Sequence, residues 1–237
     1  MLTGDKSVLV GQGLVGNFYD AFADDNKPHT NMKPLYIKEF IPRVIDYCSK
    51  YNYQYNVLTT EQIEFPHPKY KFHAQKLWYL SQYEKYDYFL WIDMDVIVKQ
   101  SAPEFPFLPG VTAVLDCNRT SILEHNHHVK VPNHEYFNTG VWGIDSQSAK
   151  SIWENGVVPL MEGAYKEYEQ HGMVDQSLIN QWACENKISH NMIGDEWNTL
   201  FCSPLWADRN NSHFIHYAGG QGNKYDRVVF DFIGGMI

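Results

Sequence analysis

Residues 88–98 read Tyr-Phe-Leu-Trp-Ile-Asp-Met-Asp-Val-Ile-Val, an apolar run that two aspartates, Asp93 and Asp95, interrupt. Apolar runs without alternation are typical of strands that are buried on both faces, as in a parallel sheet. A strand that begins near Tyr88 places both aspartates at its carboxyl end, where open α/β sheets bind their ligands. Buried carboxylates are costly unless a cation or hydrogen bonds compensate them. We therefore expect a ligand site at these two aspartates.

A divalent cation, Mn²⁺ or Mg²⁺, is the natural partner of two such carboxylates, because these ions prefer oxygen ligands. Asp-x-Asp also recurs by chance, and the alternative is a pair of aspartates that faces solvent at the end of a strand. His216 follows a short apolar run and is a candidate third ligand, since Mn²⁺ accepts imidazole alongside oxygen. The alternative for His216 is a hydrogen-bonded histidine at the end of a strand.

The composition limits the classes of function. The 237 residues are 44% hydrophobic and 20% charged, which is typical of a soluble globular protein with a sizeable core. The net charge of -9 argues against a nucleic-acid surface, which needs clustered lysines and arginines. An anionic substrate would have to be bound locally, by a metal ion and one or two well-placed cations.

The spacing of the cysteines and the length of the apolar stretches indicate the cellular compartment in which we expect the protein. Four cysteines lie far apart and form no Cys-x-x-Cys pair, which argues against a zinc site or a dense disulfide framework: Cys48, Cys117, Cys184 and Cys202. A reduced, cytoplasmic compartment is the simpler expectation. We also expect no membrane span and no signal peptide, because no stretch of about 18 apolar residues occurs and the N-terminus lacks a short apolar segment.

Residues 11–16 read Gly-Gln-Gly-Leu-Val-Gly and match a dinucleotide-binding fingerprint, after a short strand expected at residues 7–10. The fingerprint requires a helix that begins in the loop and a second strand that ends about 20 residues later. Pro28 and Pro34 disfavour that helix, and the next strand-like run begins only at Tyr53. A nicotinamide- or flavin-dependent oxidoreductase is thus a competing hypothesis, and a glycine-rich loop that a ligand approaches closely is the alternative.

Strand and helix patterns alternate along the chain, which predicts a parallel, right-handed α/β core. Apolar residues recur at helical spacing between Leu35 and Lys50, where Pro42 should bend the helix or mark its start. Residues 124–128, Glu-His-Asn-His-His, match no familiar metal site, and we interpret them as a mobile loop. The other expected elements are strands at 53–58, 111–116 and 136–144, and helices at 72–83, at 146–155 with a stop at Gly156, and from Val174.

Two charged residues have a structural and a functional interpretation. Asp175 lies in the first turn of the helix expected from Val174, where the positive potential of a helix N-terminus favours an aspartate whatever its function. Lys76 lies on the helix that precedes the 88–98 run and is a candidate second cation, with a solvated surface lysine as the alternative.

Four fragments of the chain are informative together: Trp-Ile-Asp-Met-Asp at 91–95, Phe-Asn-Thr-Gly at 137–140, Val-Asp-Gln at 174–176 and His-Tyr-Ala-Gly at 216–219. In this order and spacing they resemble the metal motif, the sugar-binding strand, the acidic helix start and the C-terminal histidine motif of nucleotide-sugar-dependent glycosyltransferases with the GT-A fold. Families 8 and 34 are the most similar. The resemblance covers roughly residues 53–224.

The resemblance implies a single α/β domain with the GT-A, Rossmann-like fold, in which helices flank a mostly parallel central sheet. Its nucleotide-binding part would be about residues 1–100, and its acceptor and sugar part about 101–237. It also implies a Mn²⁺ (or Mg²⁺) ion that Asp93, Asp95 and His216 hold against the diphosphate of a UDP- or GDP-sugar. When bound, such an ion stabilises the charge of the leaving diphosphate.

The resemblance assigns further roles. Asp175 and Gln176 would be the catalytic residues near the anomeric carbon. The donor sugar would contact Asp93, Asn138, Thr139 and Gly140, and the nucleotide or its diphosphate would contact Val10, Gly11, Lys76, Met94, Gly219 and Lys224. Lys224 departs from the family pattern, because the family's lysine follows the last glycine of the motif more closely.

We therefore expect transfer of a sugar to a glycan or another hydroxyl acceptor with retention of anomeric configuration. The alternative is a catalytically inactive protein of the same fold that binds carbohydrate or nucleotide. Acceptor recognition is expected in the loops at residues 101–134 and 195–212, where the composition indicates no particular acceptor.

Overall fold

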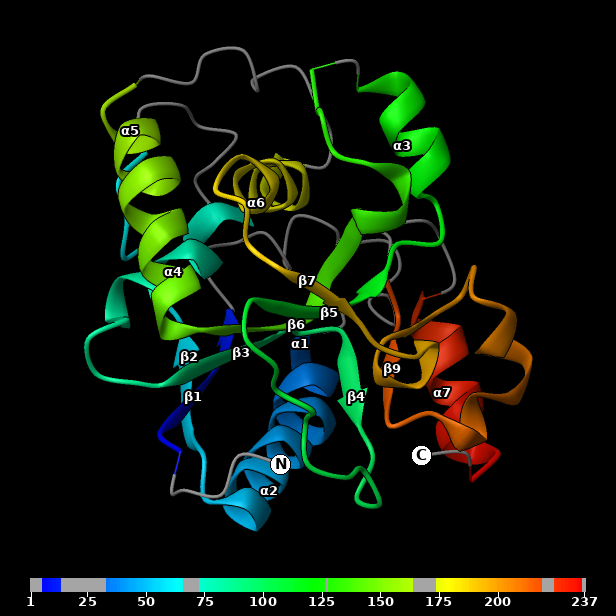
Figure 1. Cartoon of the computed structure of the whole chain (residues 1–237). Helices are drawn as coiled ribbons and strands as arrows, with labels where there is room; N and C mark the ends of the chain where they lie inside the picture. Colours follow the sequence, from blue (N-terminus) through cyan, green and yellow to red (C-terminus); the bar gives the residue numbers. More distant parts are fainter. Residues whose placement is uncertain are drawn as a thin grey trace.

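A computed structural model of the chain describes residues 6–13, 33–65, 73–126, 128–163, 174–218 and 224–235. These residues form a six-stranded central sheet with helices on both faces and a smaller, three-stranded sheet beside it (Figure 1). The expected α/β class is confirmed. None of the helices in these ranges is both long enough and apolar enough to cross a membrane.

The central sheet has the strand order β2-β1-β3-β6-β5-β7. Its strands are β1 (Val8–Gly13), β2 (Gln54–Leu58), β3 (Tyr88–Ile92), β5 (Val111–Leu115), β6 (Phe137–Asp145) and β7 (His190–Met192). Only β6 runs antiparallel to its neighbours, β3 and β5, whereas the other neighbouring strands are parallel. The sheet is therefore mostly parallel, as expected.

The 88–98 run forms two strands rather than one. β3 ends at Ile92, and the chain turns before β4 (Val96–Val98), which belongs to the second sheet with β9 (Phe214–His216) and β8 (Thr199–Leu200). Both halves of the run are fully buried, so the hydrophobic pattern contained no signal for the change of sheet. The turn places the two aspartates between the two sheets.

Alternate residues of β3 pack in different cores, because successive side chains of a strand point to opposite faces. Phe89 and Trp91 pack on the side of α4 (Ser146–Ile152), α6 (Val174–Glu185) and the 3₁₀ helix η4 (His73–Gln82). Leu90 and Ile92 pack on the side of α2 (Ile41–Tyr51). In Figure 1, α4 and α6 lie above the sheet and α2 below it. Each fully buried side chain of this size contributes roughly 1.5–3 kcal/mol, which fixes the strand that carries the site.

The remaining helices are mostly short. They are α1 (Lys33–Leu35), the π-helical turn η2 (Tyr36–Phe40), α3 (Arg119–His125), η5 (Asn133–Glu135), the π-helical turn η6 (Trp153–Val157), α5 (Val158–Met161), η8 (Asp195–Trp197), η9 (Pro204–Asn211) and α7 (Lys224–Ile233). Pro42 lies in the first turn of α2, but α1, η2 and α2 follow one another without a break, so Pro42 does not mark the start of the helix.

Three expectations are wrong in detail. Gly156 ends no helix, because α4 continues through η6 into α5, and a side chain at position 156 would overlap the Trp182 ring. The segment expected as a loop at 124–128 begins inside α3, whereas residue 127 lies outside the described residues. Gly11 and Gly13 belong to β1, where they pair with β2. A dinucleotide fingerprint needs these glycines in a loop after the strand, so the oxidoreductase hypothesis loses its structural basis.

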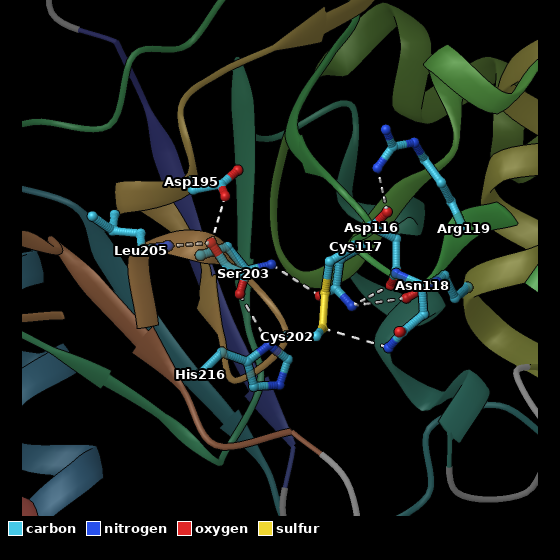
Figure 2. The surroundings of a disulfide bond; sticks show 12 residues. Asp116, Cys117, Asn118, Arg119, Asp195, Cys202, Ser203, Leu205 and His216 are labelled. Carbon is cyan, nitrogen blue, oxygen red and sulfur yellow. Dashed lines mark hydrogen bonds between the residues drawn. A yellow bond between two sulfur atoms is a disulfide. The ribbon is translucent and has the colours of Figure 1, made fainter. Parts of the chain in front are cut away.

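A disulfide joins Cys117 to Cys202, which contradicts the expectation of reduced cysteines (Figure 2). Cys117 follows β5, and Cys202 follows β8, so the bond connects the central sheet to the second sheet. It also ties together the two loops in which acceptor recognition is expected. Cys48 and Cys184 are free.

Loss of this disulfide should destabilise the protein. The bond closes a loop of 85 residues, and loops of this length restrict the unfolded chain enough to stabilise a protein by about 2–4 kcal/mol. The double variant Cys117→Ser/Cys202→Ser should therefore unfold at a lower urea concentration, and a reductant should affect the wild type only. Cys184→Ser is the matched control. An unchanged midpoint in the double variant would contradict the prediction.

Candidate active site

The three residues expected to bind metal lie together. Asp93 and Asp95 lie in the turn after β3, and the pairing of β9 with β4 sets His216 opposite Val96. His216 Nε2 lies 3.2 Å from Asp95 Oδ1 and 4.0 Å from Asp93 Oδ2. One potential ligand atom from each residue lies within 4.8 Å of the other two. The fold thus forms a three-residue cluster from two distant parts of the sequence.

The chemistry of this cluster fits a divalent cation. Two carboxylates and an imidazole are ligands that Mn²⁺ accepts, and Mg²⁺ accepts the carboxylates. The side chains of Asp93 and Asp95 are 30% and 16% exposed, so ligand positions on the solvent side stay open for a substrate. Without a cation, two carboxylates this close together repel each other, and the ammonium group of a nearby lysine, Lys76, offsets the repulsion in part.

Asp93 is fixed in position from three sides. Its Oδ1 accepts a hydrogen bond of 2.5 Å from Trp91 Nε1, and its backbone N donates to the Gly140 carbonyl over 2.6 Å. Gln12 Nε2 contacts the Asp93 carbonyl at 3.4 Å. The carboxylate is therefore oriented before any ligand binds, which is how rigid sites bind without a large entropic cost.

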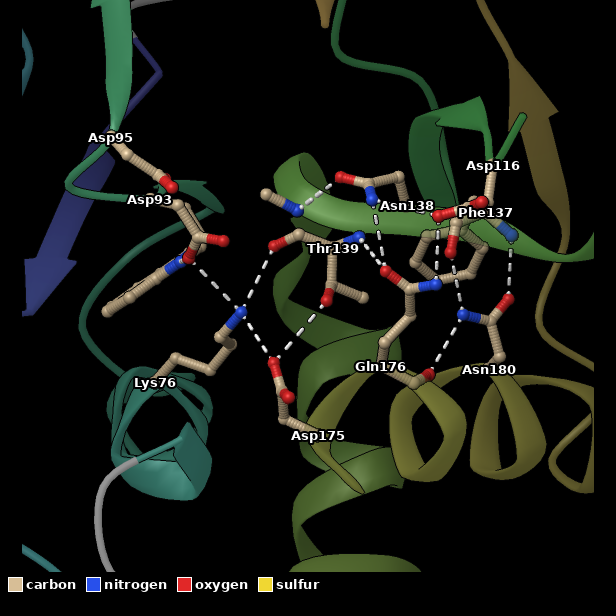
Figure 3. Close-up of polar contacts among 12 residues, drawn as sticks. Lys76, Asp93, Asp95, Asp116, Phe137, Asn138, Thr139, Asp175, Gln176 and Asn180 are labelled. Carbon is tan, nitrogen blue, oxygen red and sulfur yellow. Dashed lines mark hydrogen bonds and ion pairs between the residues drawn. The ribbon is translucent and has the colours of Figure 1, made fainter. Parts of the chain in front are cut away.

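Lys76 is a buried cation and not a surface lysine. Its side chain is 6% exposed, and its Nζ lies 3.2 Å from Asp93 Oδ1 and 2.7 Å from Asp175 Oδ2 (Figure 3). The Thr139 carbonyl also accepts a hydrogen bond from Nζ. Burial by itself lowers the pKa of Lys76, but the charges of Asp175 and Asp93 raise it by more, so its pKa lies above the ordinary value. Lys76 thus links the metal cluster to the start of α6.

Gln176 and Asn138 belong to a buried network that centres on Asp116. Asn138 Nδ2 and Gln176 Nε2 both donate to Asp116 Oδ2, over 2.9 Å and 3.0 Å. Gln176 Oε1 in turn accepts from Asn138 Nδ2 and from the backbone N of Thr139. All these groups are buried, and Figure 3 shows them side by side near the start of β6 and the start of α6. The network fixes the strand that is expected to bind the donor sugar.

Three members of the site were not predicted from the sequence. Asp116 directly follows β5 as Asp93 follows β3. The rule that open α/β sheets bind ligands at the carboxyl ends of their strands could therefore have predicted it. Asn180 holds α6 on β6, because it accepts from the Phe137 backbone N and donates to the Phe137 carbonyl. Asn198 contacts both His216 and Asn138, and no sequence motif marks it.

Gly140 makes room for the His216 ring. A side chain at position 140 would overlap the ring atoms Cε1 and Nδ1 of His216. Because β6 is hydrogen-bonded to β3 and β5 on both sides, the strand cannot move away, and the ring would have to.

Gly140→Ala should therefore weaken Mn²⁺ binding by about tenfold or more, the usual cost of disturbing a ligand's surroundings. Gly143→Ala is the matched control. Gly143 lies on the same strand as Gly140, but its new side chain would meet the Phe105 ring, away from the cluster. Titration with Mn²⁺ monitored by EPR would measure both affinities. Equal losses in the two variants would contradict the prediction.

Most of the residues expected to contact the nucleotide lie in β1, in the turn after β3 and at the start of α7. Val10 and Gly11 lie in β1, and a side chain at Gly11 would meet the Tyr79 ring at 2.6 Å, so packing alone explains this glycine. Met94 is buried between the two aspartates of the turn. Lys224 begins α7, and Gly219 lies outside the described residues. Their contacts with a nucleotide stay predictions.

Comparison with known proteins identifies the fold. No protein-family model and no curated protein sequence matches the chain. Among solved structures, a glycosyltransferase involved in the glycosylation of the major capsid of PBCV-1 superposes with a TM-score of 0.62 at 14% identity, over 94% of this chain and 99% of that one. The galactosyltransferase LgtC, in complex with donor and acceptor sugar analogs, gives 0.55 at 13% identity, over 97% and 100%.

The chain has the GT-A glycosyltransferase fold. The bifunctional glycosyltransferase WbbM has the same fold in part, with a TM-score of 0.58 at 17% identity, and all of this chain spans half of that protein. Another similar structure is an active-site variant of LgtC in which glutamate replaces glutamine, so a glutamine belongs to the active site of that enzyme. The fold expected from the four fragments is confirmed.

Proposed function

We propose that the protein is a metal-dependent glycosyltransferase that transfers a sugar from a UDP- or GDP-sugar to a hydroxyl of a glycan acceptor. The observation that carries the proposal is the convergence of Asp93, Asp95 and His216 at the carboxyl end of β3, in a fold shared with glycosyltransferases. Mn²⁺ is the ion that suits this donor set best, because it accepts both oxygen and imidazole ligands. Bound there, it would stabilise the charge that develops on the departing diphosphate.

The residues around the cluster would position the donor. Asp93 is held by Trp91 and Lys76, so its second oxygen, which faces His216, is the one that remains for the ion. Asn138 and Thr139 lie on β6 beside the cluster, where they would contact the sugar. Gly140 lets the backbone and the His216 ring come close together.

Asp175 and Gln176 would lie next to the anomeric carbon. Asp175 is the more accessible of the two, with a side chain that is 14% exposed, and its Oδ2 lies 2.7 Å from Lys76 Nζ. Gln176 is 3% exposed, and both ends of its amide are engaged, in contacts with Asp116, Asn138 and Thr139. The active-site glutamine of LgtC supports a role for Gln176. We propose retention of configuration, as in the enzymes that the four fragments resemble.

A thermal-shift assay with Mn²⁺ and either UDP or GDP tests the proposal. A ligand that binds only the folded state stabilises it by about 2.7 kcal/mol at a hundredfold excess over its Kd, so the melting temperature should rise. The base that gives the larger shift identifies the donor nucleotide. A panel of nucleotide sugars, tested for metal-dependent hydrolysis without acceptor, would then identify the sugar and separate an enzyme from an inactive binding protein. Absence of any shift with both nucleotides would contradict the proposal.

A further inference from the structure

Asn198 connects the metal cluster to the sugar-binding strand. Its side chain is buried between His216 and Asn138: Asn198 Oδ1 lies 2.9 Å from His216 Nδ1, and Asn198 Nδ2 lies 2.9 Å from Asn138 Oδ1. The segment that carries Asn198 is well fixed, because Trp197 packs edge-on against Phe214 and Phe105. The geometry of Asn198 is therefore set by the fold.

The direction of every hydrogen bond in this chain of contacts can be derived. The backbone N of Gly140 can only donate, and it contacts Asn138 Oδ1 at 2.9 Å, so this atom is the amide oxygen. Asn138 Nδ2 contacts the Asp116 carboxylate, which agrees with the same orientation. The oxygen and the nitrogen of the Asn138 amide are thus assigned, because the Gly140 N–H can only donate and the Asp116 carboxylate accepts.

The orientation of Asn198 and of His216 follows. Because Asn138 offers its oxygen to Asn198, the Asn198 group that faces it must be the NH₂ donor. Asn198 then presents its own oxygen to His216 Nδ1, and an oxygen acceptor requires a proton on that nitrogen. Nε2, which faces Asp95 and Asp93, is the nitrogen left for a metal ion.

We propose that Asn198 is a positioning residue that keeps the proton of His216 on Nδ1 and so presents Nε2 to the Asp93–Asp95 pair. The proposal rests on the proposed function where it concerns the metal ion, but the position of the proton is a property of the metal-free protein. Without the Asn198 oxygen, Nδ1 loses its hydrogen-bond acceptor, and the nearest acceptor for a ring proton is the Asp95 carboxylate, 3.2 Å from Nε2. The proton would then occupy the atom that the ion needs.

NMR of protein labelled with ¹⁵N-histidine tests the proposal without metal. Long-range ¹H–¹⁵N correlations distinguish a ring nitrogen that carries a proton from one that does not, and His216→Gln identifies the signals of His216. We expect a protonated Nδ1 in the wild type and loss of the proton from Nδ1 in Asn198→Leu. Asn198→Asp separates the two contacts, because its carboxylate keeps an acceptor at Nδ1 and should keep the proton there, whereas the donor to Asn138 Oδ1 is lost. A wild type without a proton on Nδ1, or an unchanged Asn198→Leu spectrum, would overturn the proposal.

Mn²⁺ binding gives a second readout. Asn198→Leu should bind Mn²⁺ about 10- to 100-fold more weakly than the wild type, as is usual when the partner of a metal-bound histidine is lost. Pulsed EPR should lose the ¹⁴N coupling of a bound imidazole in this variant and keep it in Asn198→Asp. Equal affinity and coupling in Asn198→Leu would overturn the role of Asn198. A wild type that binds no Mn²⁺ but has its proton on Nδ1 would instead contradict the proposed function.

Discussion

Replacing Lys76 with methionine is expected to lower the free energy of unfolding by about 3–5 kcal/mol, the usual cost of removing one partner from a buried ion pair. Methionine keeps the apolar stem of the lysine, which packs in the interior with Nζ 5.5 Å from the centre of the Trp91 ring. The charge and the hydrogen bond to the Thr139 carbonyl are lost, and Asp93 and Asp175 then face each other without the ammonium group between them. Urea denaturation in the presence of a metal chelator would measure the loss.

Two comparisons isolate the charge of Lys76. Lys150→Met removes an exposed lysine of α4 whose Nζ lies 3.9 Å from Glu154 in η6, and such surface pairs contribute at most about 1 kcal/mol. The double variant Lys76→Met/Asp175→Asn removes one of the carboxylates left unpaired and should recover part of the stability. If Lys76→Met cost no more than Lys150→Met, the buried ion pair would contribute nothing measurable.

The burial of Lys76 could not be derived from helical periodicity. Residues 73–82 form a 3₁₀ helix with three residues per turn, so Lys76 lies on the same face as the buried Tyr79. The expected α-helical spacing places Ala74, Leu77 and Leu80 on the buried side, which is correct, and leaves Lys76 on another face. This helix is buried on more than one face, so a pattern that assigns a single buried face could not place Lys76.

The fold and the positions of the two aspartates could be predicted from the sequence, because they depend on local properties of the chain. Strand burial and the position of the aspartates at the end of β3 are local properties, and the parallel α/β order follows from the alternation of elements. Contacts such as the disulfide, the bridge through Lys76 and the chain from His216 to Asn138 depend on how elements pack. Cys117 and Cys202 are 85 residues apart and lie 6.1 Å apart between Cα atoms, a proximity that no local pattern indicates.

Asp95→Asn is expected to reduce transfer by about 1000-fold, because the charge stabilisation that a bound divalent ion supplies is worth several kcal/mol and each 1.4 kcal/mol is a factor of ten. Asp95 Oδ1 is the cluster oxygen nearest to His216 Nε2, at 3.2 Å, so its replacement removes a charge from the centre of the proposed ion site. Initial rates with the donor sugar found in the nucleotide-sugar panel would measure the effect.

The stability of Asp95→Asn separates a lost ligand from a lost fold. In the metal-free protein Asp93 and Asp95 repel each other, so the neutral amide should leave the melting temperature unchanged or raise it slightly. Addition of Mn²⁺ with nucleotide should then stabilise the wild type and leave Asp95→Asn unaffected. Asp87→Asn is the matched control, because Asp87 precedes the same strand at its opposite end and bonds to Ser7. An Asp95→Asn protein with the wild-type rate and the wild-type response to Mn²⁺ would show that this carboxylate holds no ion.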